Sequence, residues 1–199
     1  MSTSLPVIAR KRRARRDNPL PAGGQVELVI DADHHRRVVV DGILKAKVSV
    51  DISTADFKAM LVPSLRGRRA PSIIEHFRRL AESGVEIRIM HSGTPSAPAL
   101  QELRAALPGN LTIRRCPRLH AKAVIIDCQR MYLGSANLTG AGLGAKSDGK
   151  RNFELGVWTT SAALIDSVLE QFNALWEGMQ CTSCKRRNVC PVPLEEPRL

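Results

Sequence analysis

The sequence is poor in aromatic residues and has no long apolar run. Its 199 residues include four Phe, two Trp and one Tyr, so aromatic side chains make up 4% of the chain. No apolar stretch approaches the roughly 18 residues that a membrane-spanning helix needs, and the N-terminus lacks the apolar segment of a secretory signal. We therefore expect a soluble, cytoplasmic protein without stable membrane association and with few stacking platforms for nucleic-acid bases.

Cysteines are few, and acidic residues are outnumbered by basic ones. Five cysteines is an odd number, and without an export signal a disulfide framework is not expected. The 19 acidic residues face 30 Lys and Arg, which leaves a net charge of +11 and favours an anionic partner, either nucleic acid or a lipid surface. Hydrophobic residues at 43% and charged residues at 25% are typical of a globular protein with a packed core.

The composition divides the chain into a basic arm, one folded domain and a cysteine-rich tail. Residues 1–24 hold a basic run followed by Pro and Gly, which predicts a flexible arm. The cations of this run are Arg10, Lys11, Arg12, Arg13, Arg15 and Arg16. Because neutralised phosphates release counterions, we expect them to contact a nucleic-acid backbone; a solubilising tail or a localisation signal is the alternative. The folded domain is expected over residues 25–178 and the tail over 179–199.

Alternating β-branched and amphipathic segments predict an α/β domain. Strands are expected at 26–30 and across 38–53, with some helix between them. The spacing of apolar residues predicts a helix over 72–83, which Gly84 ends. There follow a strand at 85–90, a helix at 97–107, a strand at 111–116, two strands within 118–137 joined by a turn near 128–130, a strand at 152–160, and a helix that Ser161 caps and that runs to about 178. This order predicts a mixed sheet with helices on both faces.

One segment matches a long motif at fixed spacing. Its residues are His120, Lys122, Asp127, Gly134, Ser135 and Asn137, in the pattern HxKxxxxDxxxxxxGSxN. Six specified residues at fixed spacing are far more specific than a lone glycine motif. With these residues the sequence resembles the phospholipase D superfamily, and the order of elements from about Val26 to Glu177 is similar too. The resemblance implies a phospholipase D-like fold and a phosphodiesterase that needs no catalytic metal.

The alternation of side chains along a strand suggests roles for the first motif residues without the resemblance. Residues two apart in a strand share a face, so His120 and Lys122 are expected to act on one phosphate. Asp127 lies an odd number of residues from His120 and turns to the opposite face, where we expect it to support the neighbouring turn by hydrogen bonds. An ordinary amphipathic strand with a satisfied histidine is the alternative for this segment.

The residues after the second strand suit a phosphoryl group. Gly134 has no side chain, so the backbone can approach a ligand there. Ser135 and Asn137 alternate onto one side, where hydroxyl and amide donors suit phosphoryl oxygens. The resemblance assigns to Glu154, further along the chain, a hydrogen bond to the catalytic imidazole that fixes its tautomer.

The resemblance also implies a two-step reaction that needs two histidines. His120 would attack phosphorus to give a phosphohistidine, which water then cleaves. A second imidazole must protonate the leaving oxygen, because an imidazole bonded to phosphorus cannot also act as the acid. None of the other four histidines repeats HxK, since the second residue after each is Arg or Gly. We therefore expect a symmetric homodimer with one site formed by His120 and Lys122 of both subunits.

Three functions are compatible with these residues. The favoured one is a metal-independent nuclease acting on DNA or RNA, similar to the small single-motif bacterial members of the superfamily, and family analogy suggests phage defence or nucleic-acid processing. A phospholipase D or phosphatidyl transferase acting on lipids is the first alternative, although no amphipathic anchor is visible in the sequence. An inactive nucleic-acid-binding module is the second.

Residues 31–35, DADHH, contain the residue types that bind hard metal ions. They suggest a metal-dependent nuclease as a further interpretation. A short charged turn after the strand at 26–30, with Asp33 capping a helix, explains the same residues without a metal, and we favour it.

Three cysteines lie close together in the tail. Cys181, Cys184 and Cys190 have the spacing CxxCxxxxxC, which is similar to the C-terminal part of the iron–sulfur staple in RecB-like nucleases. A fourth ligand would come from Cys116, from Cys128 or from a histidine, and the sequence does not choose among them. We expect a structural zinc ion or iron–sulfur cluster that fastens the tail to the core, with free thiols as the alternative.

Overall fold

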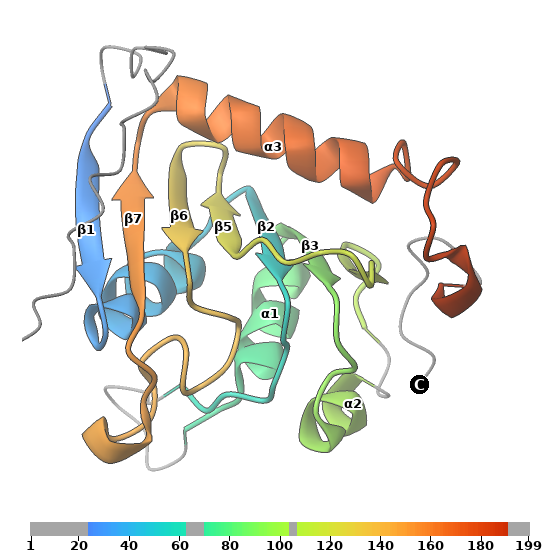
Figure 1. The fold of residues 1–199 in the computed structure, drawn as a ribbon. Helices are drawn as coiled ribbons and strands as arrows, with labels where there is room; N and C mark the ends of the chain where they lie inside the picture. The colour runs from blue at the N-terminus through green and yellow to red at the C-terminus, as the bar shows by residue number, and fades with distance from the viewer. Residues whose placement is uncertain (1–23, 63–69, 104–106, 191–199) are drawn as a thin grey trace, which may run out of the picture.

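The computed structural model describes residues 24–62, 70–103 and 107–190. At its centre is a seven-stranded mixed sheet with the strand order β1-β7-β6-β5-β2-β3-β4 (Figure 1). The strands are β1 (Val26–Ile30), β2 (Ser49–Thr54), β3 (Glu86–His91), β4 (Leu111–Arg115), β5 (Ala123–Ile126), β6 (Arg130–Gly134) and β7 (Leu155–Thr159). Strands β2, β3 and β4 run parallel, and all other neighbours in the sheet run antiparallel. The expected mixed α/β architecture is confirmed.

The strand ends next to the motif residues lie together at one edge of the sheet. Strands β2 and β6 end there, whereas β5 and β7 begin there, because Ser53 pairs with Ala123 and Gly134 pairs with Gly156. We call this the motif edge; it consists of residues 53–56, 119–123, 134–137 and 154–156. Strand pairing therefore brings together residues that are about 100 positions apart in the sequence.

Helices α1 (Ile73–Glu82) and α2 (Ala97–Leu103) lie on the face of the sheet that holds most of the core. Ser72 caps α1 by accepting the backbone N–H of Glu75 at 3.1 Å. Gly84 follows the helix with a φ of 97°, a left-handed conformation that favours glycine. The helix start and end expected from the sequence are confirmed here.

Helix α3 (Ala162–Trp176) crosses the opposite face of the sheet (Figure 1). Its first half packs on Ile125 and Met131. Its second half covers a buried ion pair, in which Nε of Arg88 donates to Asp51 at 2.6 Å and the guanidinium stacks over the rings of the helix. Helices therefore cover both faces of the sheet, as the sequence predicted.

Two expectations for individual elements are wrong. The strand expected over 38–53 exists only at 49–54, because residues 35–40 form one turn of π-helix whose valines enter the core. A short apolar run suits a buried helix as well as a strand, so β-branched residues alone do not distinguish the two. Ser161 stands at the start of α3, but its side chain makes no capping hydrogen bond. No helix within the described residues is long and apolar enough to cross a membrane.

Part of the α3 face of the sheet is not covered by that helix. Leu28, Ile30, Leu133 and Leu155 are exposed by 58%, 47%, 38% and 56%, and strand register places them on this one face. We call these four side chains the bare strip. It adjoins the motif edge, where Phe153 is 96% exposed. Apolar side chains grouped in this way mark a surface suited to a partner.

Candidate active site

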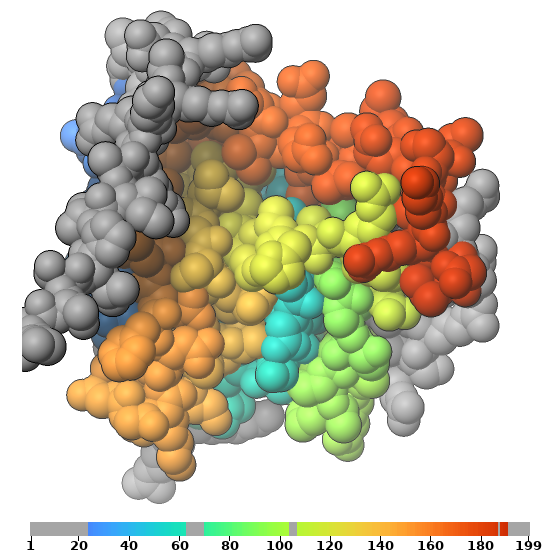
Figure 2. Space-filling view, viewed as in Figure 1, coloured from blue at the N-terminus to red at the C-terminus, as the bar shows by residue number. Residues whose placement is uncertain are grey.

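His120 and Lys122 lie in the segment that precedes β5, not in the strand itself as expected. The backbone carbonyl of Lys122 still accepts the N–H of Gly134 at 3.1 Å, so the segment remains aligned with β6. The two side chains meet, because Nζ of Lys122 lies 3.2 Å from Nδ1 and 3.3 Å from Nε2 of His120. Nζ also donates to the backbone carbonyl of His120 at 2.8 Å. Figure 2 shows this segment, in yellow, at the surface.

The two side chains differ in exposure. The ring of His120 is exposed, whereas Lys122 is buried at 9% exposure. Burial lowers the pKa of Lys122, and the charge of Glu154 opposes that effect. A cation buried beside an exposed imidazole is placed to stabilise negative charge on a group that the ring attacks.

Asn137 is held by the loop that follows β2. Its Oδ1 accepts the backbone N–H of Ala55 at 3.0 Å and of Asp56 at 3.1 Å, and the hydroxyl of Thr54 at 3.3 Å. Because a backbone N–H can only donate, these contacts fix which end of the amide is the oxygen. Nδ2 is therefore the end that can donate to a phosphoryl oxygen.

Ser135 and Glu154 contact each other. The Ser135 hydroxyl donates to the Glu154 carboxylate and accepts the backbone N–H of Leu155 at 3.0 Å. Glu154 also accepts from Nδ2 of Asn152 at 3.0 Å. The Ser135 proton is therefore directed at a carboxylate and not outward. Between the described residues of one chain, Glu154 makes no hydrogen bond to His120, so a single chain lacks the contact that the resemblance implied.

Gly134 is required for packing, and the expectation that its missing side chain lets a ligand approach the backbone stays a prediction. A Cβ at Gly134 would lie 2.4 Å from the hydroxyl of Tyr132, and one at Gly156 would lie 2.3 Å from its ring. The Tyr132 hydroxyl accepts the backbone N–H of Ala136 at 3.0 Å and lies 3.0 Å from Nε2 of His34. Because Nδ1 of His34 faces the Asp31 carbonyl, which can only accept, the neutral ring carries its proton on Nδ1 and accepts the tyrosine proton at Nε2. Burial raises the pKa of Tyr132 to about 12, so its hydroxyl stays protonated and keeps this donor role.

Tyr132 and His34 support the loop of the motif, and sequence reasoning missed both. The only sequence signal for Tyr132 was that the chain's one tyrosine falls within the motif spacing. The sequence suggests for His34 only a metal ligand or a place in a charged turn. Their contact joins residues 98 positions apart, which no local pattern reveals.

Asp127 occupies the opposite edge of the sheet, in the turn between β5 and β6. Its Oδ1 accepts three backbone N–H groups, those of Lys47, Val48 and Ser49, at 2.8 to 3.1 Å. Its Oδ2 accepts from Arg130 at 3.0 Å. Burial alone would raise the pKa of Asp127, but these donors together lower it. The expected supporting hydrogen bonds are present, but Asp127 lies in a turn beyond the end of β5 and not on the opposite face of a strand that also holds His120.

The DADHH segment follows β1 and makes hydrogen bonds to the residue just before β7. Oδ1 of Asp31 accepts the backbone N–H of Glu154 at 2.9 Å, and the Asp31 carbonyl lies 2.9 Å from Nδ1 of His34. Asp33 lies within the following helical turn and does not cap it as suggested. The turn interpretation fits these contacts, because the groups that would bind a metal hold the backbone of the motif edge.

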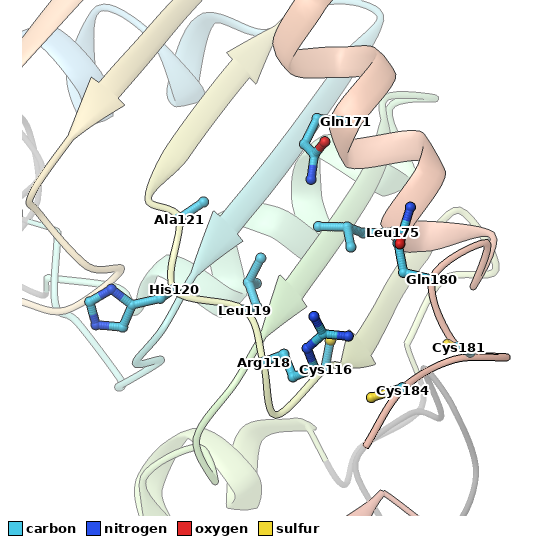
Figure 3. A pocket seen from close by; sticks show the side chains of 10 residues that line it. All are labelled: Cys116, Arg118, Leu119, His120, Ala121, Gln171, Leu175, Gln180, Cys181 and Cys184. Atoms are coloured by element: carbon cyan, nitrogen blue, oxygen red, sulfur yellow. The ribbon is translucent and has the colours of Figure 1, made fainter. Parts of the chain in front are cut away.

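The cysteines divide between the two edges of the sheet. Cys116, Cys181 and Cys184 line one cavity of about 490 Å³ that also reaches His120 (Figure 3). Cys128 is exposed in the β5–β6 turn. Within the described residues, no three His, Cys, Asp or Glu side chains are arranged so that they hold a metal ion as they stand. The basic run from Arg10 to Arg16 lies outside the described residues.

Solved structures of several proteins share this fold. NucT from Helicobacter pylori is 18% identical with a TM-score of 0.58, over 78% of this chain and 97% of that chain. Nuc from Salmonella typhimurium, a phospholipase D family member, is 20% identical with a TM-score of 0.58, over 78% and 95%. TrmBL2, an archaeal chromatin protein with a novel mode of DNA binding, is 15% identical with a TM-score of 0.50, over 81% and 55%. No curated protein sequence matches this chain.

The fold and the motif edge together define a phospholipase D-type phosphodiesterase architecture. Residues 39–176 match the family described as "Cardiolipin synthase, PLD-like domain". The chain therefore belongs to this phospholipase D-like family, and the resemblance based on the motif is confirmed.

Proposed function

We propose that the protein is a metal-independent nuclease that cleaves the DNA or RNA backbone at a site shared by two subunits. The observation that carries the proposal is the position of His120, Lys122 and Asn137 along one edge of the sheet: an exposed imidazole, a buried cation and an amide of fixed orientation. Two copies would surround one phosphoryl group with two cations and two amide donors. These donors supply the charge stabilisation for which other phosphoryl-transfer enzymes use magnesium.

The proposed reaction has two displacements at phosphorus. In the first, a ring nitrogen of His120 attacks, a P–N bond forms and the P–O bond to the leaving group breaks. The partner subunit's His120 gives its proton to the leaving oxygen. In the second, the partner's His120 takes a proton from water, the water oxygen bonds to phosphorus and the P–N bond breaks. Both imidazoles return to their starting protonation states.

A homodimer is proposed because one chain supplies one such histidine. The bare strip adjoins the motif edge and offers an apolar surface for the second copy, so covering it would stabilise the dimer by about 25 cal/mol for each Å² buried. Association through this surface would also bring Glu154 of each subunit close to the other subunit. The missing contact between Glu154 and His120 within one chain agrees with such an arrangement.

Nucleic acid is the proposed substrate because the chain carries a net charge of +11. Exposed Lys185 and Arg186 add positive charge beside the cavity that reaches His120. One protein of similar fold, TrmBL2, is described as binding DNA. With few aromatic residues, we expect contacts to the backbone and little sequence preference. The family description names a cardiolipin synthase, so lipid phosphodiesters form the second candidate substrate class.

The first experiment distinguishes the substrates. The full chain is incubated in EDTA with plasmid, single-stranded DNA, RNA and lipid vesicles. Cleavage of nucleic acid supports the proposal, and cleavage of lipid alone overturns it. An inactive binding module would turn over none of them and would bind polyanions equally well after His120→Ala.

The second experiment tests the nucleophile. A radiolabelled phosphodiester should leave an acid-labile label on the wild-type protein and on the control variant His76→Asn, whose residue lies in α1. His120→Asn should carry no label and should lose at least about a thousandfold in cleavage rate. Label retained on His120→Asn would refute the assignment.

A further inference from the structure

The three cysteines of the tail take no part in the proposed reaction. Cys181, Cys184 and Cys190 follow α3 directly, in a segment of turns and one short helix over Arg187–Val189. Thiols spaced as CxxC are suited to one tetrahedral ion or cluster. The structure shows which part of the fold lies beside this segment.

That neighbour is the end of β4. Cys116 follows β4, and its backbone N–H donates to the carbonyl of His91 at 2.8 Å, which places it at the motif edge. Cys116 and Cys181 both pack against the small apolar cluster formed by Met90, Leu119, Phe172 and Trp176. In Figure 3, Cys184 lies near Arg118, and Cys116 lines the same cavity. Three of the five cysteines therefore line one cavity.

Cys128 lies at the other edge of the sheet. Its Sγ is 4.0 Å from the hydroxyl of Ser49, which begins β2, whereas Cys116 contacts the backbone at the end of β3. Ser49 pairs with Glu86 and Thr54 pairs with His91, so the two cysteines are separated by about five residues of strand, or roughly 16 Å. The thiol of Cys128 cannot reach the tail unless the β5–β6 hairpin unfolds.

The tail is tethered beside Cys116. Nη1 of Arg186 donates to the backbone carbonyl of Pro117 at 3.1 Å. The backbone of Arg186 and the side chain of Arg118 also hydrogen-bond to Cys184, so this thiol is held where it lines the cavity. These contacts keep the tail over the cavity but do not close it into a ligand cage, in agreement with the absence of a formed metal group in the described residues. Because metal binding is coupled to folding, the ligands need not be arranged as a cage before the metal binds.

We propose that Cys116, Cys181, Cys184 and Cys190 bind one tetrathiolate metal centre, a zinc ion or an iron–sulfur cluster, that fastens the tail to the end of β4. The proposal selects Cys116 as the fourth ligand and excludes Cys128. It does not depend on the proposed nuclease reaction. Because the cavity also reaches His120, the metal centre would fix the position of one wall of this cavity, next to the motif edge.

The test measures bound metal directly. The full chain is purified without chelator, both in air and anaerobically, and zinc, iron and acid-labile sulfide are determined per chain. We expect about one zinc ion, or iron and sulfide in cluster proportion, in the wild type and in the matched control Cys128→Ser. Cys116→Ser should retain less than about a tenth of that metal. No metal in the wild type, equal loss in the two variants, or full content in Cys116→Ser would each overturn the proposal.

A second readout covers the case in which Cys116→Ser fails to fold. Cys190→Ser changes a residue outside the sheet, and Co²⁺ added to the chelated protein reports thiolate ligands by its charge-transfer absorption. We expect this absorption to fall in Cys190→Ser and to be unchanged in Cys128→Ser. Unchanged absorption in Cys190→Ser would contradict the four-cysteine assignment.

Discussion

The motif edge and the cysteine-rich tail each carry a motif, but they are held in place differently. At the motif edge, backbone N–H groups fix the amide of Asn137, and Tyr132 anchors the same loop. The described part of the tail consists of turns and one short helix, held to the core by contacts such as that of Arg186 with Pro117. Strand register thus preorganises the chemistry of the first region, whereas the proposal for the second is that a bound metal completes its structure.

The largest expected effect tests whether the motif edge is complete in one copy. Leu155→Asp places a charge in the bare strip, so apolar contact across the proposed dimer is replaced by repulsion. We expect dissociation to monomers and a loss of at least about a hundredfold in nuclease activity, because the second imidazole is removed. Sedimentation and plasmid cleavage at equal protein concentration measure the two effects.

The matched control for this variant lies in the tail. Met179 is 72% exposed, so Met179→Asp adds the same charge at a surface outside the bare strip. It should remain dimeric and active. A Leu155→Asp protein that stays dimeric would show that the subunits associate through another surface.

The next effect concerns the rigidity of the motif edge. Gly156→Ala brings a methyl group against the Tyr132 ring and should destabilise the fold by about 1–3 kcal/mol through overpacking. Gly149→Ala is the control, since nothing lies within 4 Å of its Cβ, and it should change stability by less than about 0.5 kcal/mol. Urea unfolding compares them; equal stabilities would mean that Tyr132 is loosely packed.

The smallest effect concerns the opposite end of the hairpin that carries the motif. Asp127→Asn removes the charge that three backbone N–H groups and Arg130 stabilise, at an expected cost of about 1–2 kcal/mol near neutral pH. The folded-state pKa of Asp127 lies below its ordinary value of 3.8. Its stabilisation is therefore present above that value and is lost as the pH falls through the folded-state pKa.

Unfolding curves of the wild type and Asp127→Asn should converge as the pH falls below about 4. A stability difference that does not change with pH would show that the charge of Asp127 plays no part. Arg130 keeps its place in the variant, so the comparison isolates the carboxylate.

The sequence predicted best what lies within one hairpin. Strands β5 and β6 are joined by a short turn, so a fixed spacing from His120 to Asn137 becomes a fixed geometry. Helix α1 was also predicted, because Ser72 and Gly84 act on their immediate neighbours. Local spacing determines such features directly.

What the sequence did not predict depends on distant partners. Val38 and Val39 enter the core from a π-helix because of what packs around them. The role of Gly134 follows from the Tyr132 hydroxyl, and that hydroxyl is in turn held by His34. The partners of Glu154 within one chain could not be read from a motif, because Ser135 and Asn152 each donate to one oxygen of its carboxylate.

The way in which Asn137 is held has a consequence for substitutions in the loop that follows β2. Two of its three restraints come from main-chain groups of Ala55 and Asp56, which every amino acid except proline offers. Replacement of either side chain by any residue but proline therefore leaves these two donors in place. The rim of the site offers two positions that can be redesigned while the amide beneath them stays oriented.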